Sequence, residues 1–205
     1  MSTVNDQQDI KREKILDASY QRFLHYGYSK TTMNEIASDL SLSKALLYYY
    51  FPDKSQLYIA VMRKLAADYL KSLEDNIVTF TDLKEAFVFQ VNTNHDFIVK
   101  NYNFFDSFRL NEQNLPDTIW EIISEIHQSE MKLLSDVFKA EVEKGKIRPV
   151  DNPEEIVDLL LDALHAVRVR SISHKKFKLP QKEHLDEIHS KRLLLIDIFI
   201  KGLKY

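Results

Sequence analysis

Apolar residues recur at the spacing of a helix face along nearly the whole chain. Over residues 9–25 the apolar stripe includes Ile15, Tyr20 and Phe23, and Gly27 stands where a left-handed turn can end the helix. No stretch shows the sustained alternation of apolar and polar positions that is typical of a half-buried strand. The pattern therefore predicts an all-α protein.

Capping residues predict two short helices after the first one. Thr32 followed three residues later by Glu35 is a capping-box signature, which opens a second helix. Ser43 can cap a third helix, which ends before Pro52 because the residue preceding proline is biased away from the helical conformation. Asp53 can cap a fourth, much longer helix.

Helical patterns continue beyond the fourth helix, and about nine helices are expected in total. The expected range of the fourth helix is 53–75, and those of the later helices are 82–100, 102–111, 116–145, 152–173 and about 185–203. We expect residues 1–54 to form an N-terminal three-helix domain and residues 55–205 a larger helical domain. The helix over 53–75 would bridge the two.

The composition narrows the class of protein. The chain is 44% hydrophobic and 29% charged, with three glycines and five prolines, which is typical of a soluble helical protein. No apolar run approaches the roughly 18 residues of a membrane span, and the polar start lacks the apolar core of a signal peptide, so we expect a cytoplasmic location. The lack of cysteine excludes disulfides, zinc fingers and cysteine nucleophiles.

Net charge does not indicate a nucleic-acid ligand. The formal charge is −3, and within residues 1–54 seven basic side chains are matched by seven acidic ones. A DNA-binding function must therefore depend on where individual side chains lie.

The first four predicted helices have the layout of a helix-turn-helix, in which the second of two short helices enters the major groove. That helix presents Lys44, Ala45, Tyr48 and Tyr49 on one face. Ala45 is small enough to approach base edges closely, and Lys44 can reach a guanine acceptor or a phosphate. The tyrosine hydroxyls can donate to phosphate oxygens, and Lys54 adds a positive charge at the start of the next helix.

The aromatic run at residues 47–51 has a second interpretation, as part of the domain core. Helical spacing puts Leu47, Tyr50 and Phe51 on the inner face, where core packing explains them best. Tyr48 and Tyr49 fall on the outer face, so we interpret them as phosphate or base contacts.

These residues carry a resemblance to a known family. The matching positions are Ile15-Leu16-Asp17-Ala18, Phe23, Gly27-Tyr28, Thr31-Thr32, Ile36-Ala37, Leu42-Ser43-Lys44, Leu47-Tyr48-Tyr49-Tyr50-Phe51, Lys54 and Leu57. At this spacing they resemble the signature of the TetR family of repressors. The motif covers about the first quarter of the chain, and the rest is similar in the order and length of its helices.

The resemblance implies a set of DNA contacts. Thr32 would cap the second helix against a phosphate, Lys44, Ala45 and Tyr49 would face bases, and Tyr48 and Lys54 would clamp the backbone. With the adjoining motif residues, the expected DNA-binding set is Thr31, Thr32, Ser43, Lys44, Ala45, Tyr48, Tyr49 and Lys54. Ser41 and Ala45 replace glycines that are frequent in the family, so either Ser41 takes a strained left-handed conformation or the turn is altered.

The C-terminal region is expected to mediate dimerisation and ligand binding. Its last two helices are apolar around more of their circumference than one core face would use, and the expected dimer residues are Leu160, Leu164, Val167, Leu195, Ile198 and Phe199. Burial of these residues within the monomer is the alternative. Aromatic residues interleaved with polar ones predict a cavity for an apolar or aromatic effector, lined by Phe87, Val91, His95, Tyr102, Phe105, Phe108, Trp120 and Ile123. Core packing explains most of these aromatics singly.

Rival functions leave little trace in the sequence. The seven histidines lack the spacing of a zinc protease, and no glycine-rich phosphate loop occurs, so we expect no catalysis, no metal and no cofactor. A helical adaptor that binds another protein remains the alternative to a repressor that binds a palindromic operator as a homodimer. An activator is a third interpretation, and neither the operator, the effector nor the regulated genes follow from the sequence.

Overall fold

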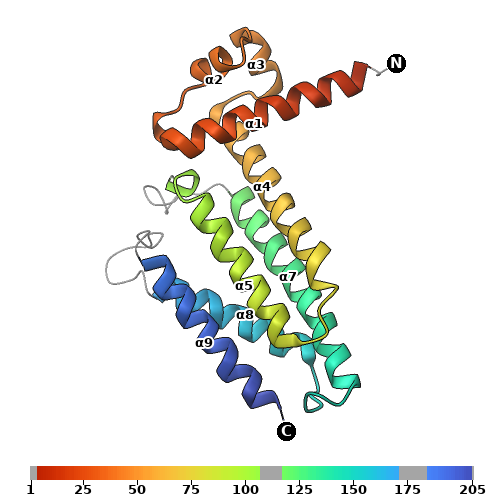
Figure 1. Cartoon of the computed structure of the whole chain (residues 1–205). Coiled ribbons are helices and arrows are strands. Elements are labelled where there is room, and N and C mark those ends of the chain that lie inside the picture. The colour runs from red at the N-terminus through yellow and green to blue at the C-terminus, as the bar shows by residue number, and fades with distance from the viewer. Residues whose placement is uncertain (1–3, 107–116, 171–183, 205) are drawn as a thin grey trace. The chain divides into compact units, whose positions relative to one another are not determined.

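The computed structural model describes residues 4–106, 117–170 and 184–204. Within these ranges it contains eight α-helices, one 3-10 helix and no strand, so the all-α prediction is confirmed (Figure 1). The elements are α1 (Val4–Lys30), α2 (Met33–Asp39), α3 (Lys44–Tyr50), α4 (Lys54–Ile77), α5 (Leu83–Lys100), η1 (Phe104–Asp106), α7 (Asp117–Glu143), α8 (Pro153–Arg170) and α9 (Leu185–Leu203). No helix in the described part of the chain is long and apolar enough to cross a membrane.

Contacts group the described residues into two compact units. Unit 1 takes those up to Leu65 and those from Asn101 to Ile119, and unit 2 takes those of Ala66–Lys100 and from Trp120 onward. The predicted domains, 1–54 and 55–205, were defined by function and not by contacts. That division therefore stays a prediction.

The N-terminal helices begin and end where the capping residues predict. The Thr32 hydroxyl accepts from the backbone N–H of Glu35 at 3.3 Å, while the Glu35 carboxylate accepts from the backbone N–H of Thr32 at 2.8 Å. Ser43 caps α3 by accepting from the Leu46 N–H at 3.2 Å. The Asp53 carboxylate accepts from the Gln56 N–H at 2.8 Å at the start of α4. These bonds satisfy backbone donors that a helix N-terminus otherwise leaves without partners.

Two turns in unit 1 use positive backbone angles. Gly27 interrupts α1 with a φ of 76° and a ψ of 166°, a conformation that only glycine adopts freely, as its position predicted. Ser41, between α2 and α3, has a φ of 52°. The strained left-handed alternative for Ser41 is therefore the one that the chain adopts.

The core of unit 1 joins the first four helices to η1. Phe23, Tyr58 and Phe104 form its aromatic centre, in which the rings of Tyr58 and Phe104 stack with centroids 4.5 Å apart. The Tyr58 hydroxyl donates to the Phe104 carbonyl at 2.7 Å, and the Tyr20 hydroxyl donates to Asn101 Oδ1 at 2.9 Å. Residues 101–106, which follow α5 along the chain, are therefore packed into the unit that holds the helix-turn-helix.

The described residues of the helix expected over 102–111 are not α-helical. Residues 101–103 form turns and residues 104–106 a 3-10 helix, while residues 107–111 lie outside the described ranges. The Phe104 carbonyl accepts from the hydroxyl of Tyr58, 46 positions away in the chain, which ties this segment to α4.

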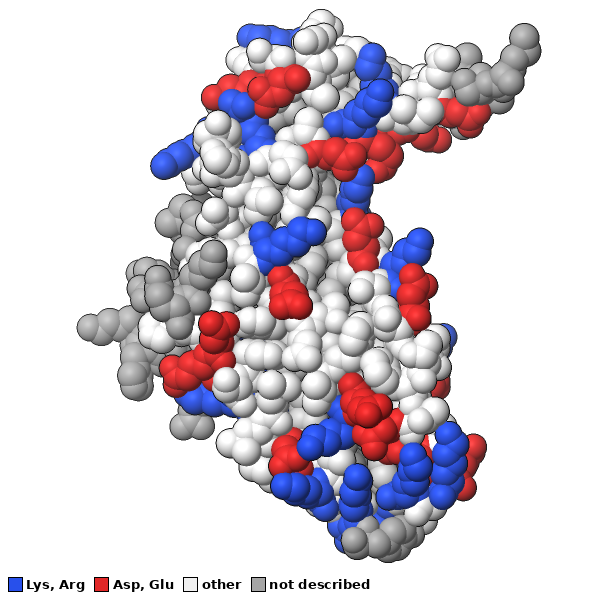
Figure 2. All heavy atoms as spheres, in the orientation of Figure 1, with Lys and Arg blue, Asp and Glu red and all other residues white. Residues whose placement is uncertain are grey.

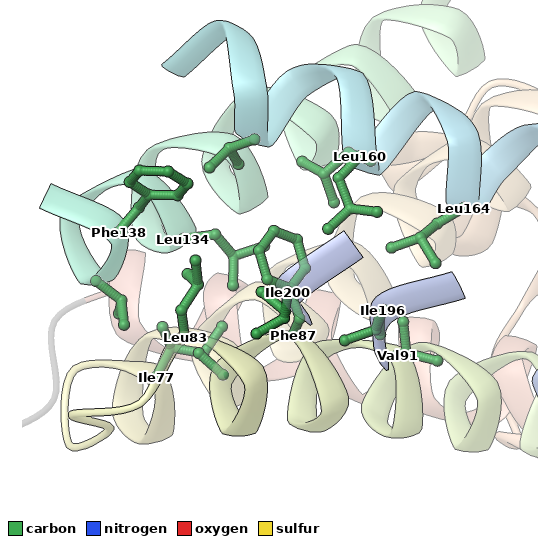
Figure 3. Packing of buried hydrophobic residues seen from close by; sticks show 14 of the residues in the cluster. Ile77, Leu83, Phe87, Val91, Leu134, Phe138, Leu160, Leu164, Ile196 and Ile200 are labelled. Atoms are coloured by element: carbon green, nitrogen blue, oxygen red, sulfur yellow. The ribbon is translucent and has the colours of Figure 1, made fainter. Parts of the chain in front are cut away.

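Unit 2 is built around one apolar cluster to which α4, α5, α7, α8 and α9 all contribute. Figure 3 shows Phe87 and Val91 of α5 directed toward Ile196 and Ile200 of α9, and Leu160 of α8 directed into the same cluster from the side opposite α5. Burial of such side chains is the main stabilising contribution to a helical domain. This cluster forms the apolar surroundings of the buried polar groups described below.

Candidate nucleic-acid interface and ligand site

The outer face of α3 is open to solvent. Lys44 and Ala45 are exposed, and the side chains of Tyr48 and Tyr49 are 46% and 69% exposed. Leu47, on the opposite face, is fully buried in the core of unit 1. The predicted separation of an inner and an outer face therefore holds, and the four exposed residues are brought together on one short helix.

The start of α2 combines the exposed Thr32 with a network of charges. The Thr32 hydroxyl and backbone N–H both bond Glu35, and Arg22 of α1 lies 3.2 Å from Glu35 and 2.7 Å from Asp39. The hydrogen bonds from Thr32, supported by Arg22, hold the pKa of Glu35 below its usual value. This ion-paired cluster fixes α2 against α1 and so fixes the turn that aims α3.

Two residues of the predicted DNA-binding set have internal roles. Thr31 is fully buried, and its hydroxyl donates to the Gly27 carbonyl at 2.8 Å, so its side chain does not lie on the exposed face. The Lys54 ammonium donates to the carbonyls of Tyr28 and Thr31, both at 2.9 Å, and lies 4.2 Å from the centre of the Tyr28 ring. Burial lowers the pKa of Lys54. Lys54 therefore ties the start of α4 to the turn before α2.

The surface of unit 1 carries both signs of charge. On the face seen in Figure 2, Lys and Arg side chains lie beside Asp and Glu side chains over α1 and its neighbours. Lys64 of α4 shows this pairing, because its ammonium lies 2.6 Å from Glu13 and 2.7 Å from Asp17 of α1. DNA contact by this unit would therefore rest on particular side chains of α3, as the balanced charge of residues 1–54 indicates.

The residues expected to line one ligand cavity lie in different surroundings. Phe87 and Val91 are fully buried in the apolar cluster of unit 2, whereas Trp120 and Ile123 are 51% and 38% exposed. Tyr102 and Phe105 belong to unit 1 and His95 to unit 2, and Phe108 lies outside the described residues. The lining set as a whole therefore stays a prediction, and the members that belong to unit 2 are Phe87, Val91, His95, Trp120 and Ile123.

Unit 2 contains a buried polar cluster that sequence reasoning missed. Its central residues are Tyr69 of α4, Gln90 of α5, Glu130 of α7, Arg168 of α8 and Arg192 of α9, and only Arg168 among them is more than slightly exposed. Tyr69 donates its hydroxyl to Glu130 Oε1, and Gln90 Nε2 donates to the same oxygen at 2.8 Å. All five helices of the unit therefore contribute a polar side chain to the cluster.

Burial is the largest cause of the pKa shifts in this polar cluster. Burial, followed by the charge of Glu130, raises the pKa of Tyr69 well above its usual value and keeps the phenol neutral. Burial, followed by repulsion from Arg168, lowers the pKa of Arg192 to about 10. The Arg192 guanidinium is therefore still charged at neutral pH.

Histidines of unit 2 lie near this cluster without forming a metal site. The His95 and His189 rings stack with centroids 4.3 Å apart, and His95 Nε2 lies 3.2 Å from Asp186 Oδ1. His127 Nε2 lies 2.7 Å from Asp158 Oδ1. In the described residues, no group of three or more His, Asp or Glu side chains is arranged to hold a metal ion.

The residues expected at a dimer interface divide into buried and exposed sets. Leu160 and Leu164 are buried in the cluster of unit 2, Leu195 and Phe199 are partly buried against it, and Val167 is partly buried. Ile198 is 60% exposed. Leu159 and Leu194, which the sequence analysis did not select, are each 59% exposed on the same two helices. In the sequence, each of these two leucines stands directly next to a residue of the inward-facing apolar stripe, and this position is the signal that could have identified it.

Comparison with known proteins finds a family match for the N-terminal region. Residues 15–61 match the family model described as bacterial regulatory proteins, tetR family. The chain is 25% identical over 153 residues to the HTH-type transcriptional regulator RutR of Escherichia coli K12, which covers 73% of this chain and 70% of RutR. This relative is named as a regulator of transcription.

Solved structures share the fold over nearly the whole chain. A transcriptional regulator from Cytophaga hutchinsonii superposes with a TM-score of 0.82 at 24% identity, covering 95% of this chain and 99% of that one. FadR from Bacillus subtilis, solved in complex with stearoyl-CoA, gives 0.59 at 15% identity, with 93% and 98% covered. A regulator from Saccharomonospora viridis, solved in complex with choline, gives 0.66 at 17% identity, with 96% and 99% covered.

Proposed function

Because this chain belongs to the TetR family of bacterial regulatory proteins, we propose that it represses transcription by binding a palindromic operator as a homodimer and that a small effector releases it. The observation that supports this best is the outer face of α3, where Lys44, Ala45, Tyr48 and Tyr49 are exposed on a helix held by a rigid cap and turn. A helix of this kind reads base edges in the major groove.

Each subunit would place one α3 in a major groove. A single short recognition helix makes a small interface, and a two-fold dimer enlarges it by reading two half-sites about 34 Å apart. Lys44 and Ala45 would face bases, and Tyr48 and Tyr49 would contact bases or phosphates from the same face. The N-terminus of α2, with Thr32, would lie against a phosphate.

The dimer would form through α8 and α9. Leu159, Leu194 and Ile198 are large apolar side chains exposed on these two helices, which pack against each other within unit 2. Charged residues are depleted at the centre of dimer interfaces, which are more apolar than the remaining surface. Leu160 and Leu164 support the interface from within the monomer core.

The dimer surface can be tested with one substitution and a matched control. Ile198→Glu should convert a dimer to a monomer in analytical ultracentrifugation, because it buries a charge at the interface. Val78→Glu replaces an apolar residue that is 70% exposed in the turn just after α4, outside α8 and α9, and should leave the dimer intact. An Ile198→Glu protein that remains a dimer of wild-type strength would exclude α9 as the interface.

The effector would act by shifting a conformational equilibrium of the dimer. A ligand that binds better to the form whose two recognition helices do not fit successive grooves favours that form. Helix α5 leads directly into residues 101–106, which are packed into unit 1 through Tyr20 and Tyr58. A displacement of α5 would therefore reach the core beneath the helix-turn-helix along the chain.

The function as a whole is tested by selecting genomic DNA fragments that bind the purified protein. Recovery of a palindrome by a dimer supports the proposal, and Lys44→Ala should then weaken binding by about 1–3 kcal/mol without changing the dimer. A folded protein that enriches no sequence would instead be the helical adaptor that the sequence left open.

A further inference from the structure

The buried polar cluster of unit 2 carries more positive than negative charge. It holds two guanidinium groups, on Arg168 and Arg192, and one carboxylate, on Glu130. Arg192 is only 6% exposed and Glu130 only 7%. A buried charge without a counter-charge is costly, so an arrangement of this kind favours the entry of an anion.

The carboxylate inside the cluster does not pair with either arginine. Glu130 Oε1 accepts from Tyr69 and Gln90, while Arg192 Nη1 donates to Asn94 Oδ1 at 2.9 Å and Arg168 Nη2 lies 2.8 Å from His165 Nδ1. Among the residues that the structure describes, the side-chain hydrogen-bond partners of Arg168 and Arg192 are thus a histidine and an asparagine, not a carboxylate. Both positive charges therefore keep their capacity to bind an anion.

Polar atoms in the cluster are left without partners. Arg192 Nε and Gln90 Oε1 are buried and make no hydrogen bond within the described part of the chain. Gln90 is only 2% exposed. Buried donors and acceptors without partners are rare in native proteins, and a ligand is one of the few explanations for them. A guanidinium offers parallel N–H groups whose spacing matches the two oxygens of a carboxylate.

The surroundings of the cluster are apolar. On α5, Gln90 lies between the buried Phe87 and Val91, and the Tyr69 ring lies 5.1 Å from the ring of Phe97. The cluster is thus continuous with the core shown in Figure 3, in which Phe87 and Val91 are labelled. A ligand that satisfies both parts has a charged end and an apolar body.

We propose that this cluster binds the carboxylate of a small organic acid with an apolar body, and that Arg192 and Arg168 are the anion-binding pair. This rests on the proposed function, because it assigns the chemical class of the effector. The related folds solved with stearoyl-CoA and with choline hold ligands of opposite charge. The shared fold therefore does not predict the charge of the ligand, which is inferred here from the binding residues of this chain. A cation is disfavoured here because Glu130 is already engaged and two positive charges lie nearby.

The test measures thermal unfolding of the full-length protein at constant ionic strength with hexanoate, phenylacetate and their uncharged amides. A ligand that binds the folded state raises the melting temperature by mass action. We expect at least one acid to raise it and the matching amide, at the same concentration, to leave it unchanged. Equal stabilisation by acid and amide, or no stabilisation by either acid, overturns the proposal.

Variants assign the binding to the two arginines. Arg192→Met should weaken binding of the stabilising acid roughly 10- to 100-fold, the range expected for lost charge-assisted hydrogen bonds. Arg148→Met, which removes an exposed arginine elsewhere in unit 2, should leave the affinity unchanged. Unchanged affinity in Arg192→Met overturns the assignment.

The unliganded variants separate a binding role from a structural one. Arg192→Met should unfold at the same or a higher temperature than wild type, because it removes the repulsion between Arg192 and Arg168. A large fall in melting temperature makes Arg192 a structural residue and overturns the proposal. If Arg192→Met does not fold, Arg192→Lys keeps the charge without the two-pronged donor, and it should still weaken acid binding several-fold.

Failure of this inference is distinguishable from failure of the proposed function. The same preparation is assayed for binding to its selected operator. A dimer that binds its palindrome and ignores both acids overturns the organic-acid assignment alone. A protein that binds an acid through Arg192 and enriches no DNA sequence overturns the repressor function alone.

Discussion

Lys54 offers a sharp test, because the family resemblance and the structure give it different roles. The resemblance makes it a clamp on the DNA backbone, whereas in the structure its ammonium donates to the Tyr28 and Thr31 carbonyls. Lys54→Met keeps the length of the side chain and removes the charge and all three donors. If Lys54 is a phosphate clamp, the variant loses DNA affinity alone. If Lys54 has the structural role, the variant loses stability of unit 1.

The magnitude follows from the contacts. A hydrogen bond from a charged group contributes about 1.5–3 kcal/mol when buried, and the partial exposure of Lys54 puts its two bonds at the low end of that range. The ring of Tyr28, 4.2 Å from the ammonium, adds about 0.5–1 kcal/mol. Burying the ammonium costs part of this gain, so we expect Lys54→Met to destabilise unit 1 by about 2–4 kcal/mol.

Two assays on the same variant decide between the roles. Urea unfolding gives the free energy of unfolding, and operator binding over a series of salt concentrations counts the phosphates that are neutralised. Lys44→Met, at an exposed position on α3, is the control, and it should weaken operator binding with stability within about 0.5 kcal/mol of wild type. Wild-type stability in Lys54→Met would refute the structural role and restore the phosphate clamp if the slope of log affinity against log salt concentration also fell by about 1.8, which corresponds to one lost phosphate contact per subunit of the dimer.

Three further predictions concern single positions. Ser41→Gly should stabilise the protein by about 0.5–1 kcal/mol in urea unfolding, because glycine adopts the φ of 52° without strain, and a loss of stability would contradict this. Thr32→Ala should cost about 1 kcal/mol, because it breaks the capping box with Glu35, and an unchanged unfolding midpoint would assign no stability to that cap. Burial and then the charge of His95 lower the pKa of His189 below its ordinary 6.5. Arg192 adds to this shift, whereas Asp96 and Asp186 oppose it. Because the folded-state pKa is the lower one, the unfolded state binds more protons than the folded state. Stability is therefore fully present above pH 6.5 and falls as the pH falls through the lower folded pKa, and His189→Gln should flatten the unfolding midpoint measured between pH 7 and 5. An equally steep pH dependence in that variant would contradict the assignment to His189.

The helix-turn-helix could be predicted because its signals are local. The bonds that Thr32 and Ser43 make as caps reach only three residues along the chain, and the positive φ of Gly27 is a property of that residue alone. Such features depend little on the remaining fold. The same reasoning explains why the outer face of α3 was assigned correctly.

The elements that were harder to predict depend on distant residues. Nothing in residues 102–111 indicates that Tyr58 will bond the Phe104 carbonyl, which lies 46 positions away. The stripe on α8 shows that the helix is apolar on several sides, but it does not show whether Leu159 or Leu160 faces the core of its own subunit. Fold contacts put Leu160 inside and leave Leu159 exposed, so a dimer test belongs on the exposed side.

The proposed ligand site shows most clearly what sequence reasoning cannot reach. Aromatic residues were the visible signal, yet Phe87 fills the core and Trp120 lies at the surface. The buried polar atoms that lack a partner in the described part of the chain include those of Gln90 and Arg192, and these residue types are mostly exposed in proteins. Only the packing of five helices removes them from water, and burial is what converts an ordinary surface arginine into a group that needs an anion. The proposed chemical class of the effector therefore rests on buried polar atoms without partners, whereas the aromatic residues Phe87 and Trp120 give no such indication.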